Sequence, residues 1–257
     1  MFQNNTKREK PDMHMKLLLA KMLACSVLLA VTSASARAPG GEMAAPVFSD
    51  AVELTRIDQY TLKSAVHLVD GIDPIGSENT IRVVVEIPTG STQKWEVEKS
   101  SGDLKWEFRK GQPRFVKYLG YPGNYGMVPR TLLSAANGGD GDPLDVLVLG
   151  PAVPRGSVVE VKVIGMLRMR DKGEQDDKLI AVMANDIFDK IDTIKKLDKE
   201  FPGVTAIVEM WFANYKGQTK IETMGYVGRT KSHAVLSQAL DEYKRASTQG
   251  ADAPQIQ

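Results

Sequence analysis

Asp140-Gly141-Asp142-Pro143-Leu144-Asp145-Val146-Leu147-Val148-Leu149 is an acidic loop that runs directly into an apolar strand. Three carboxylates on so short a loop repel one another unless cations lie between them. The preceding Gly138-Gly139 pair and the internal proline indicate a fixed turn rather than a solvated acidic stretch. Oxygen ligands without neighbouring His or Cys favour Mg²⁺, Mn²⁺ or Ca²⁺. The stretch therefore predicts a site for hard cations at the start of a buried strand.

Two known acidic motifs do not fit this loop. A calcium-binding EF-hand loop needs glycine at its sixth position and glutamate at its twelfth, but counting from Asp140 these are Asp145 and Pro151. An aspartyl phosphotransferase carries its Asp-x-Asp pair after a strand, whereas here the strand follows and Pro143 comes next. A merely solvated polar turn is the remaining alternative.

Two further clusters argue against the solvated turn. The segment 171–178 places several carboxylates and a lysine directly after a predicted strand. The segment 121–126 carries two tyrosines on a loop shaped by glycine and proline. Abundant aspartate with interspersed cationic and phenolic side chains suggests several metal ions and an anionic, oxygen-rich substrate.

Strand patterns dominate the first half of the chain, and helical patterns come later. The hydrophobic spacing predicts strands at 81–87, 95–98, 104–108, 146–149 and 158–166, and helices at 204–215 and from 232 onward. A turn at 100–103 makes the second and third strands a hairpin. This order predicts an α+β fold, with a small sheet or barrel flanked by helices, two of them C-terminal.

Composition limits the class of protein. The 257 residues are 42% apolar and 25% charged, which is typical of one globular domain. A net charge of +1 gives no electrostatic reason to expect nucleic acid as a partner. The single cysteine, Cys25, excludes an internal disulfide and makes a sulfur-based zinc site untenable.

The N-terminal region resembles a secretory signal peptide. Five basic residues precede an apolar run, Met22–Val31, and a small-x-small site ends at Ala36. We expect cleavage after Ala36 and export to the periplasm or the medium, with translation starting at Met1, Met13 or Met15. The run is too short for a permanent membrane span, and lipidation at Cys25 is the alternative. The expected divisions are a signal peptide at 1–36, a linker at 37–60, a domain at 61–246 and a disordered tail at 247–257.

Taken together, these motifs resemble the soluble family I inorganic pyrophosphatases. Their signature Asp-x-Asp-Pro-x-Asp matches the acidic loop, and further matches follow in the same order and spacing across roughly residues 80 to 217. They are Glu86-Ile87-Pro88, Lys94-Trp95-Glu96, Arg114-Phe115-Val116, Tyr121–Gly126, Asp171–Lys178 and Tyr215-Lys216. The resemblance implies a closed five-stranded, OB-like β-barrel and hydrolysis of pyrophosphate to two phosphates.

The resemblance also assigns roles to the acidic residues. It implies that Asp140, Asp145 and Asp176 hold an activating Mg²⁺, with Asp145 bridging towards a second. The resemblance also implies that Asp142 lies beside the nucleophilic hydroxide that these metals would generate, where it would act as general base. Asp171 and Asp176 bind the Mg²⁺ that arrives with the substrate, and Glu86 supports a further ion. Several Mg²⁺ ions are therefore expected, and Mn²⁺ is an expected substitute.

The basic and phenolic residues match positions that bind phosphate. These substrate-binding positions are Lys94, Arg114, Tyr125, Lys178, Tyr215 and Lys216, and Glu96 and Tyr121 match positions around them. Arginine suits bidentate phosphate contact, whereas lysine acts as a point charge. Arg109 is a nearby alternative to Arg114.

Three functional hypotheses follow. The first is a Mg²⁺-dependent pyrophosphate hydrolase, the second an exported polyphosphate- or divalent-metal-binding protein without turnover, and the third an enzyme that acts on tripolyphosphate or nucleotides. Family members form different assemblies, and we expect a homo-oligomer.

Overall fold

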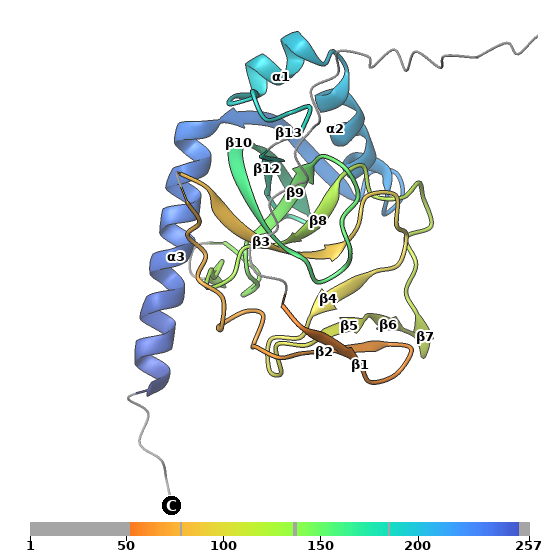
Figure 1. Ribbon diagram of the computed structural model, residues 1–257. Coiled ribbons are helices and arrows are strands. Elements are labelled where there is room, and N and C mark those ends of the chain that lie inside the picture. Colours follow the sequence, from red (N-terminus) through yellow and green to blue (C-terminus); the bar gives the residue numbers. More distant parts are fainter. Residues whose placement is uncertain (1–51, 78, 136–137, 185, 252–257) are drawn as a thin grey trace, which may run out of the picture. The chain divides into compact units, whose positions relative to one another are not determined.

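Most strands precede the helices, as the sequence predicts, but one strand lies between the second and third helices, in a mixed α+β fold (Figure 1). The computed structural model describes residues 52–77, 79–135, 138–184 and 186–251. The strands are β1 (Leu54–Arg56), β2 (Thr61–Ser64), β3 (Ile81–Ile87), β4 (Trp95–Val97), β5 (Leu104–Trp106), β6 (Phe108–Arg109), β7 (Gln112–Pro113), β8 (Asn124–Met127), β9 (Asp145–Leu149), β10 (Val158–Asp171), β11 (Glu174–Gln175), β12 (Lys178–Met183) and β13 (Ile221–Gly228). The helices are α1 (Ile194–Glu200), α2 (Val204–Asn214) and α3 (Arg229–Ala251).

The larger sheet is built around the long strand β10. β10 pairs with β12 on one side and with β3 on the other, while β12, β9, β8 and β3 pair in that order. These five strands therefore form a ring of pairings, to which β11 and β13 add at the far end of β10. β9 and β12 are parallel, and nearly all of their side chains are buried, which explains their unbroken apolar character.

The register of the paired strands brings the acidic loop next to the start of β12. Leu179 of β12 pairs with Val146 of β9, so Lys178 and Asp145 lie at the same end of neighbouring strands. Asp145 in turn pairs with Met127 of β8. Gly126 allows the close approach of β8 to β3, because a Cβ there would collide with the carbonyl oxygen of Val84.

A smaller sheet, in the order β1-β2-β5-β4, packs on the ring and supplies the hairpin that carries Lys94 and Glu96. Trp95 and Leu104 bury their side chains against Val84 and Met127 of the ring. Because Trp95 points into this core, the alternation of the strand turns its neighbours away from it. The hairpin thereby presents its polar residues to the other side.

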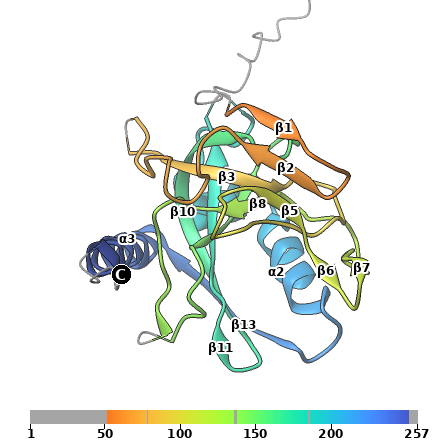
Figure 2. The same cartoon turned by 90° about the horizontal axis from the view of Figure 1, so that it is seen from below.

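Helices cover two sides of the ring (Figure 2). α3 packs on β10 and β13 through Leu236 and Ala239, and α2 packs on β13 and buries Trp211 and Phe212 in a second cluster with Tyr121 and Tyr125. α1 begins at the N-cap Thr193, whose side chain accepts a hydrogen bond from the backbone N–H of Lys196. In the described residues, no helix is both long and apolar enough to cross a membrane.

Several predicted boundaries need correction. The last part of the expected linker forms β1, because Leu54–Arg56 pairs with β2. The strand expected at 104–108 ends at Trp106, β10 continues to Asp171, and α3 begins at Arg229 and runs through Ala251 into the expected tail. The patterns at β8, β12, β13 and α1 were not predicted as elements. The expected signal peptide at 1–36, which includes Cys25, and residues 37–51 and 252–257 lie outside the described residues.

Candidate active site

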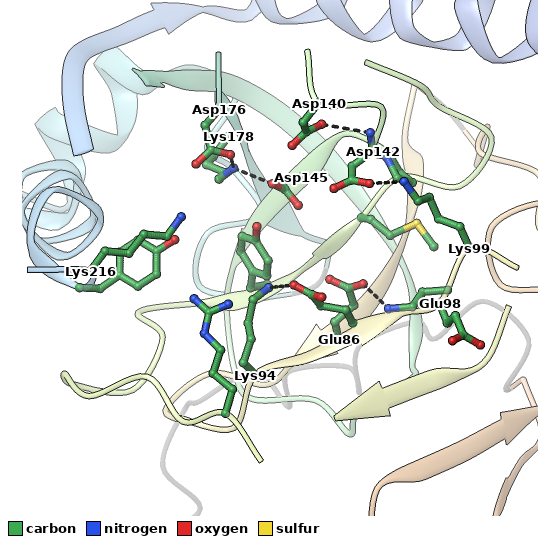
Figure 3. A pocket seen from close by; sticks show the side chains of 17 residues that line it. Glu86, Lys94, Glu98, Lys99, Asp140, Asp142, Asp145, Asp176, Lys178 and Lys216 are labelled. Atoms are coloured by element: carbon green, nitrogen blue, oxygen red, sulfur yellow. Dashed lines mark hydrogen bonds and ion pairs between the residues drawn. The ribbon is translucent and has the colours of Figure 1, made fainter. Parts of the chain in front are cut away.

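A polar cavity of about 360 Å³ opens beside the acidic loop (Figure 3). Its walls come from β3, the β4 hairpin, β8, the acidic loop, the start of β12 and the end of α2. The lining residues are Glu86, Lys94, Glu96, Val97, Glu98, Lys99, Arg114, Tyr125, Met127, Asp140, Asp142, Pro143, Asp145, Asp176, Lys178, Tyr215 and Lys216. Segments 130 residues apart in sequence therefore meet around one polar space.

The acidic loop is held in a defined turn. Gly141 has φ +82°, a left-handed conformation that favours glycine, and the N–H of Asp142 donates to Asp140 Oδ1 at 3.0 Å. The N–H of Gly141 donates to the carbonyl of Leu133 at 2.8 Å, and the N–H of Leu133 donates to the carbonyl of Asp142 at 2.9 Å. Partial burial raises the pKa of Asp140, with the neighbouring carboxylates adding to the effect. The loop thus concentrates negative charge at the cavity wall.

Lys178 lies between two of the predicted metal ligands. Its side chain is 2% exposed, and its Nζ lies 2.6 Å from Asp145 Oδ2 and also contacts Asp176 Oδ1. Burial alone would lower the pKa of Lys178, but the two carboxylates outweigh burial, so that the pKa is raised and the lysine is charged. A buried cation therefore already bridges Asp145 and Asp176.

Asp171 lies just outside the cavity lining. Its Oδ2 accepts a hydrogen bond from Lys216 Nζ at 2.6 Å. Its Oδ1 is buried and has no hydrogen-bond partner among the described residues. Buried anionic oxygens are costly unless they are paired or bind a cation. This oxygen is a fitting position for a metal ligand.

Glu86 and Lys94 form the opposite wall. Glu86 is buried, and its Oε1 accepts a hydrogen bond from the N–H of Val97 at 2.7 Å. Lys94 Nζ lies 2.7 Å from Glu96 Oε1 and 5.2 Å from the centre of the Tyr125 ring. Burial raises the pKa of Glu86 to about 8, although Lys94 opposes that rise. This wall therefore holds a carboxyl group that gains a charge only when pH rises or a cation approaches.

The remaining basic and aromatic residues come from the segment after β7, the loop before β8 and the end of α2. Arg114 lines the cavity and donates through Nη1 to Glu107 Oε1 at 2.7 Å, whereas the alternative, Arg109, lies on the exposed β6. Tyr215 stacks on Trp211 with ring centroids 4.7 Å apart. Tyr121 is buried against Trp211, 4.4 Å between ring centroids, and packs behind the cavity rather than lining it.

All of the predicted site residues except Asp171 and Tyr121 line this cavity, and each of those two contacts a lining residue, Asp171 with Lys216 and Tyr121 with Tyr125. Sequence reasoning missed Lys99, whose Nζ contacts Asp142 Oδ1 and lies 3.1 Å from the carbonyl oxygen of Gly141. It also missed Glu98 and Met127. Lys99 follows β4, the strand that carries Glu96, and its position just after that strand is the signal that could have indicated it.

The carboxylates fit divalent cations in type, and lysines contact several of them in this structure. Among the described residues, no three His, Cys, Asp or Glu side chains gather closely enough to surround one ion. Lys178 and Lys99 contact Asp145, Asp176 and Asp142, the groups that would face a metal. Hard oxygen donors and the unpaired oxygen of Asp171 are nevertheless the chemistry that Mg²⁺ and Mn²⁺ prefer.

Carboxylates, lysines, an arginine and tyrosines around one cavity define a class of protein, the metal-assisted enzymes of phosphate anions. The sequence model described as inorganic pyrophosphatase matches residues 83–244, and the chain belongs to that family.

Individual relatives agree with this assignment. The inorganic pyrophosphatase of Gluconobacter oxydans is 36% identical over 168 residues, which cover 63% of this chain and 90% of the relative. That of Rickettsia conorii is 33% identical over 180 residues, which cover 67% of this chain and 97% of the relative. The crystal structure of inorganic pyrophosphatase from Thermus thermophilus superposes with a TM-score of 0.59 at 29% identity, covering 70% of this chain and 99% of that one.

The raised pKa of Glu86 predicts a pH-dependent stability of the metal-free protein. Unfolded glutamate titrates near 4.5 and folded Glu86 near 8, so the folded state holds one more proton between these values. The free energy of unfolding should therefore fall as pH rises through this window, by an amount on the order of a few kcal/mol. Glu86→Gln keeps the hydrogen bond from Val97 and should remove this part of the slope. Urea denaturation of both proteins in chelator, at several pH values between these limits, measures the slope. If the free energy of unfolding of the two proteins changed with pH in parallel, the raised pKa of Glu86 would be contradicted.

Proposed function

We propose that this protein hydrolyses inorganic pyrophosphate to two phosphates. The observation that carries the proposal is the meeting of acidic loops with lysine, arginine and tyrosine groups around one cavity. Pyrophosphate is a compact polyanion, so it needs both cationic donors and metal ions for which carboxylates are the ligands. Membership of the inorganic pyrophosphatase family supports this substrate.

The basic and phenolic groups act on the phosphate oxygens in this proposal. Lys94, Arg114 and Lys216 each contact a carboxylate, so each would exchange that partner for a phosphate oxygen or share itself between the two. The hydroxyl groups of Tyr125 and Tyr215 add neutral donors. Because the anion is held by several groups, its reacting phosphorus is oriented before attack.

The acidic groups provide the metal sites and the base. We propose that Asp140, Asp145, Asp171, Asp176 and Glu86 hold Mg²⁺, with Mn²⁺ as a substitute. When bound, divalent cations neutralise phosphate oxygens and lower the pKa of water. Asp142 is 56% exposed at the cavity wall and takes the proton of the attacking water. The water oxygen forms a bond to one phosphorus, and the bridging P–O bond breaks, which releases the second phosphate.

The decisive test is phosphate release from pyrophosphate by the purified protein. We expect turnover with Mg²⁺ and its loss in excess chelator, with recovery when Mg²⁺ is restored. Tight binding of polyphosphate or divalent metal without any turnover would support the binding-protein alternative instead. A panel with tripolyphosphate and nucleoside triphosphates under each metal separates the third hypothesis from the first.

Three further proposals come from the sequence and the pairings. We propose that the ring of paired strands is a closed, OB-like five-stranded barrel, which a crystal structure would test.

Export is inferred from the signal-like residues up to Ala36, and we expect the native protein to begin at Arg37 on N-terminal sequencing. Retention of residues 1–36 in a cytosolic pool would refute export. A homo-oligomer is expected, and sedimentation analysis measures it.

A further inference from the structure

The acidic loop rests on a short segment that is itself attached to α3. The N–H of Leu132 donates to the carbonyl of Ala239 on α3 at 3.0 Å. The N–H of Ser134 donates to the side chain of Glu242 on α3, at 2.9 Å from Oε2. These two hydrogen bonds place residues 132–134 directly against the helix.

Backbone hydrogen bonds continue from this segment to the acidic loop. The N–H of Gly139 donates to the carbonyl of Ser134 at 3.1 Å, and Leu133 exchanges hydrogen bonds with Gly141 and Asp142. Gly139 also approaches so closely that a Cβ at this position would collide with Leu133. Any displacement of 132–134 from the helix therefore moves the backbone that carries Asp140 and Asp142.

Glu242 is unusual on its helix. α3 directs most of its charged side chains to solvent, as Asp241 and Lys244 show, yet Glu242 is only 6% exposed. Its Oε1 accepts a hydrogen bond from Gln238 Nε2 at 2.8 Å, so the carboxylate is fixed from within the helix. Burying a carboxylate is costly, and this cost is offset only where donors meet it.

Apolar contacts already attach α3 to the ring. Leu236 and Ala239 are buried in the core cluster with strands of the ring. Glu242 instead directs its carboxylate at Ser134, in the segment that supports the acidic loop. A small cavity of about 90 Å³ beside it is lined by Gly139 of the acidic loop and by Gln175, the neighbour of Asp176. α3 thus lies behind both acidic segments.

We propose that Glu242 is a positioning residue that holds the acidic loop, and with it Asp140 and Asp142, in the geometry that binds metal and substrate. It touches neither the cavity nor the reacting atoms, and it acts through the N–H of Ser134 and the Leu133 ladder. The catalytic consequence rests on the proposed function, whereas the structural consequence does not.

Glu242→Ala removes the acceptor and tests the proposal in the metal-free protein. We expect amide hydrogen exchange at Leu133 and Gly141 to become about 10- to 100-fold faster, because a hydrogen bond to a charged group is lost at the base of the loop. Exchange in β12 should stay as in the wild type. Calorimetric titration with Mg²⁺ should show weaker binding, and kcat for pyrophosphate should fall more than KM changes.

Two variants serve as controls. Glu242→Gln retains an acceptor for Ser134 and should restore most of the exchange protection. Asp241→Ala removes the neighbouring exposed carboxylate, which pairs with Lys244 at 3.8 Å, and should leave loop exchange and Mg²⁺ binding unchanged. Wild-type exchange at Leu133 and Gly141 in Glu242→Ala overturns the proposal. Equal acceleration in β12 also overturns it, because that pattern reports general destabilisation.

The readouts separate this proposal from the proposed function. Exchange and Mg²⁺ titration need no pyrophosphate, so they report on the loop even in a protein without turnover. A wild type that releases no phosphate, together with a Glu242→Ala variant whose loop exchanges faster, refutes the proposed function and supports the positioning role.

Discussion

Asp142→Asn should lower the kcat for pyrophosphate hydrolysis by about 10²- to 10⁴-fold, the usual contribution of a positioned general base. The asparagine amide can still accept the contact from Lys99 but cannot take a proton from water. Asp142 and Lys99 are both more than half exposed, so the loss of their ion pair should change the free energy of unfolding by only about 0–1 kcal/mol. Activity should therefore fall while stability is nearly unchanged.

A matched control distinguishes the loss of the general base from the mere loss of a negative charge at the cavity. Glu98→Gln removes another carboxylate from the lining, one that pairs with Lys105 at 2.6 Å outside the acidic loop. Its effect on kcat should be much smaller than that of Asp142→Asn. Steady-state phosphate release at saturating Mg²⁺ and urea denaturation measure both variants. Equal kcat values for wild type and Asp142→Asn would exclude Asp142 as the base.

Short motifs that resemble those of the pyrophosphatase family indicated most of the residues that line the cavity. The acidic loop combines carboxylates with glycine and proline, and Ile81–Ile87 and Val146–Leu149 are unmistakable as buried strands. β8 was missed because the turn residues in Tyr121–Gly126 mask a strand whose conformation depends on pairing with β3 and β9. α1 was missed because one short helix carries too few apolar positions for a periodic signal.

Long-range contacts account for the functional residues that sequence could not indicate. Lys99 meets Asp142 only because the β4–β5 hairpin folds against the acidic loop, 43 positions later in the chain. Glu242 lies three residues after the buried Ala239, at the edge of the apolar face of α3, and its carboxylate is met by the N–H of Ser134 from another segment. Periodicity describes one element at a time, so it cannot show which charged position another element will bury.

Lys178→Met should destabilise the metal-free protein by roughly 3 kcal/mol, the lower end for a broken buried ion pair, because Asp145 and Asp176 keep some exposure. Methionine fills a similar volume but leaves two neighbouring carboxylates without their cation. Mg²⁺ can replace the missing charge, so added Mg²⁺ should stabilise Lys178→Met more than it stabilises the wild type. Turnover should nevertheless remain low, since the phosphate contact that the family resemblance implies for Lys178 is also lost.

Urea denaturation in chelator and at several Mg²⁺ concentrations measures both effects. The control is Lys99→Met, which breaks an exposed pair on the same acidic surface and should cost at most about 1 kcal/mol in chelator. Wild-type stability of Lys178→Met in chelator would mean that the two carboxylates do not need a cation between them. A Mg²⁺ stabilisation no larger than that of the wild type would mean that the metals and Lys178 do not compete for Asp145 and Asp176. The free energy of unfolding of Lys178→Met, with and without Mg²⁺, therefore tests whether Asp145 and Asp176 bind divalent cations, and the test needs no turnover.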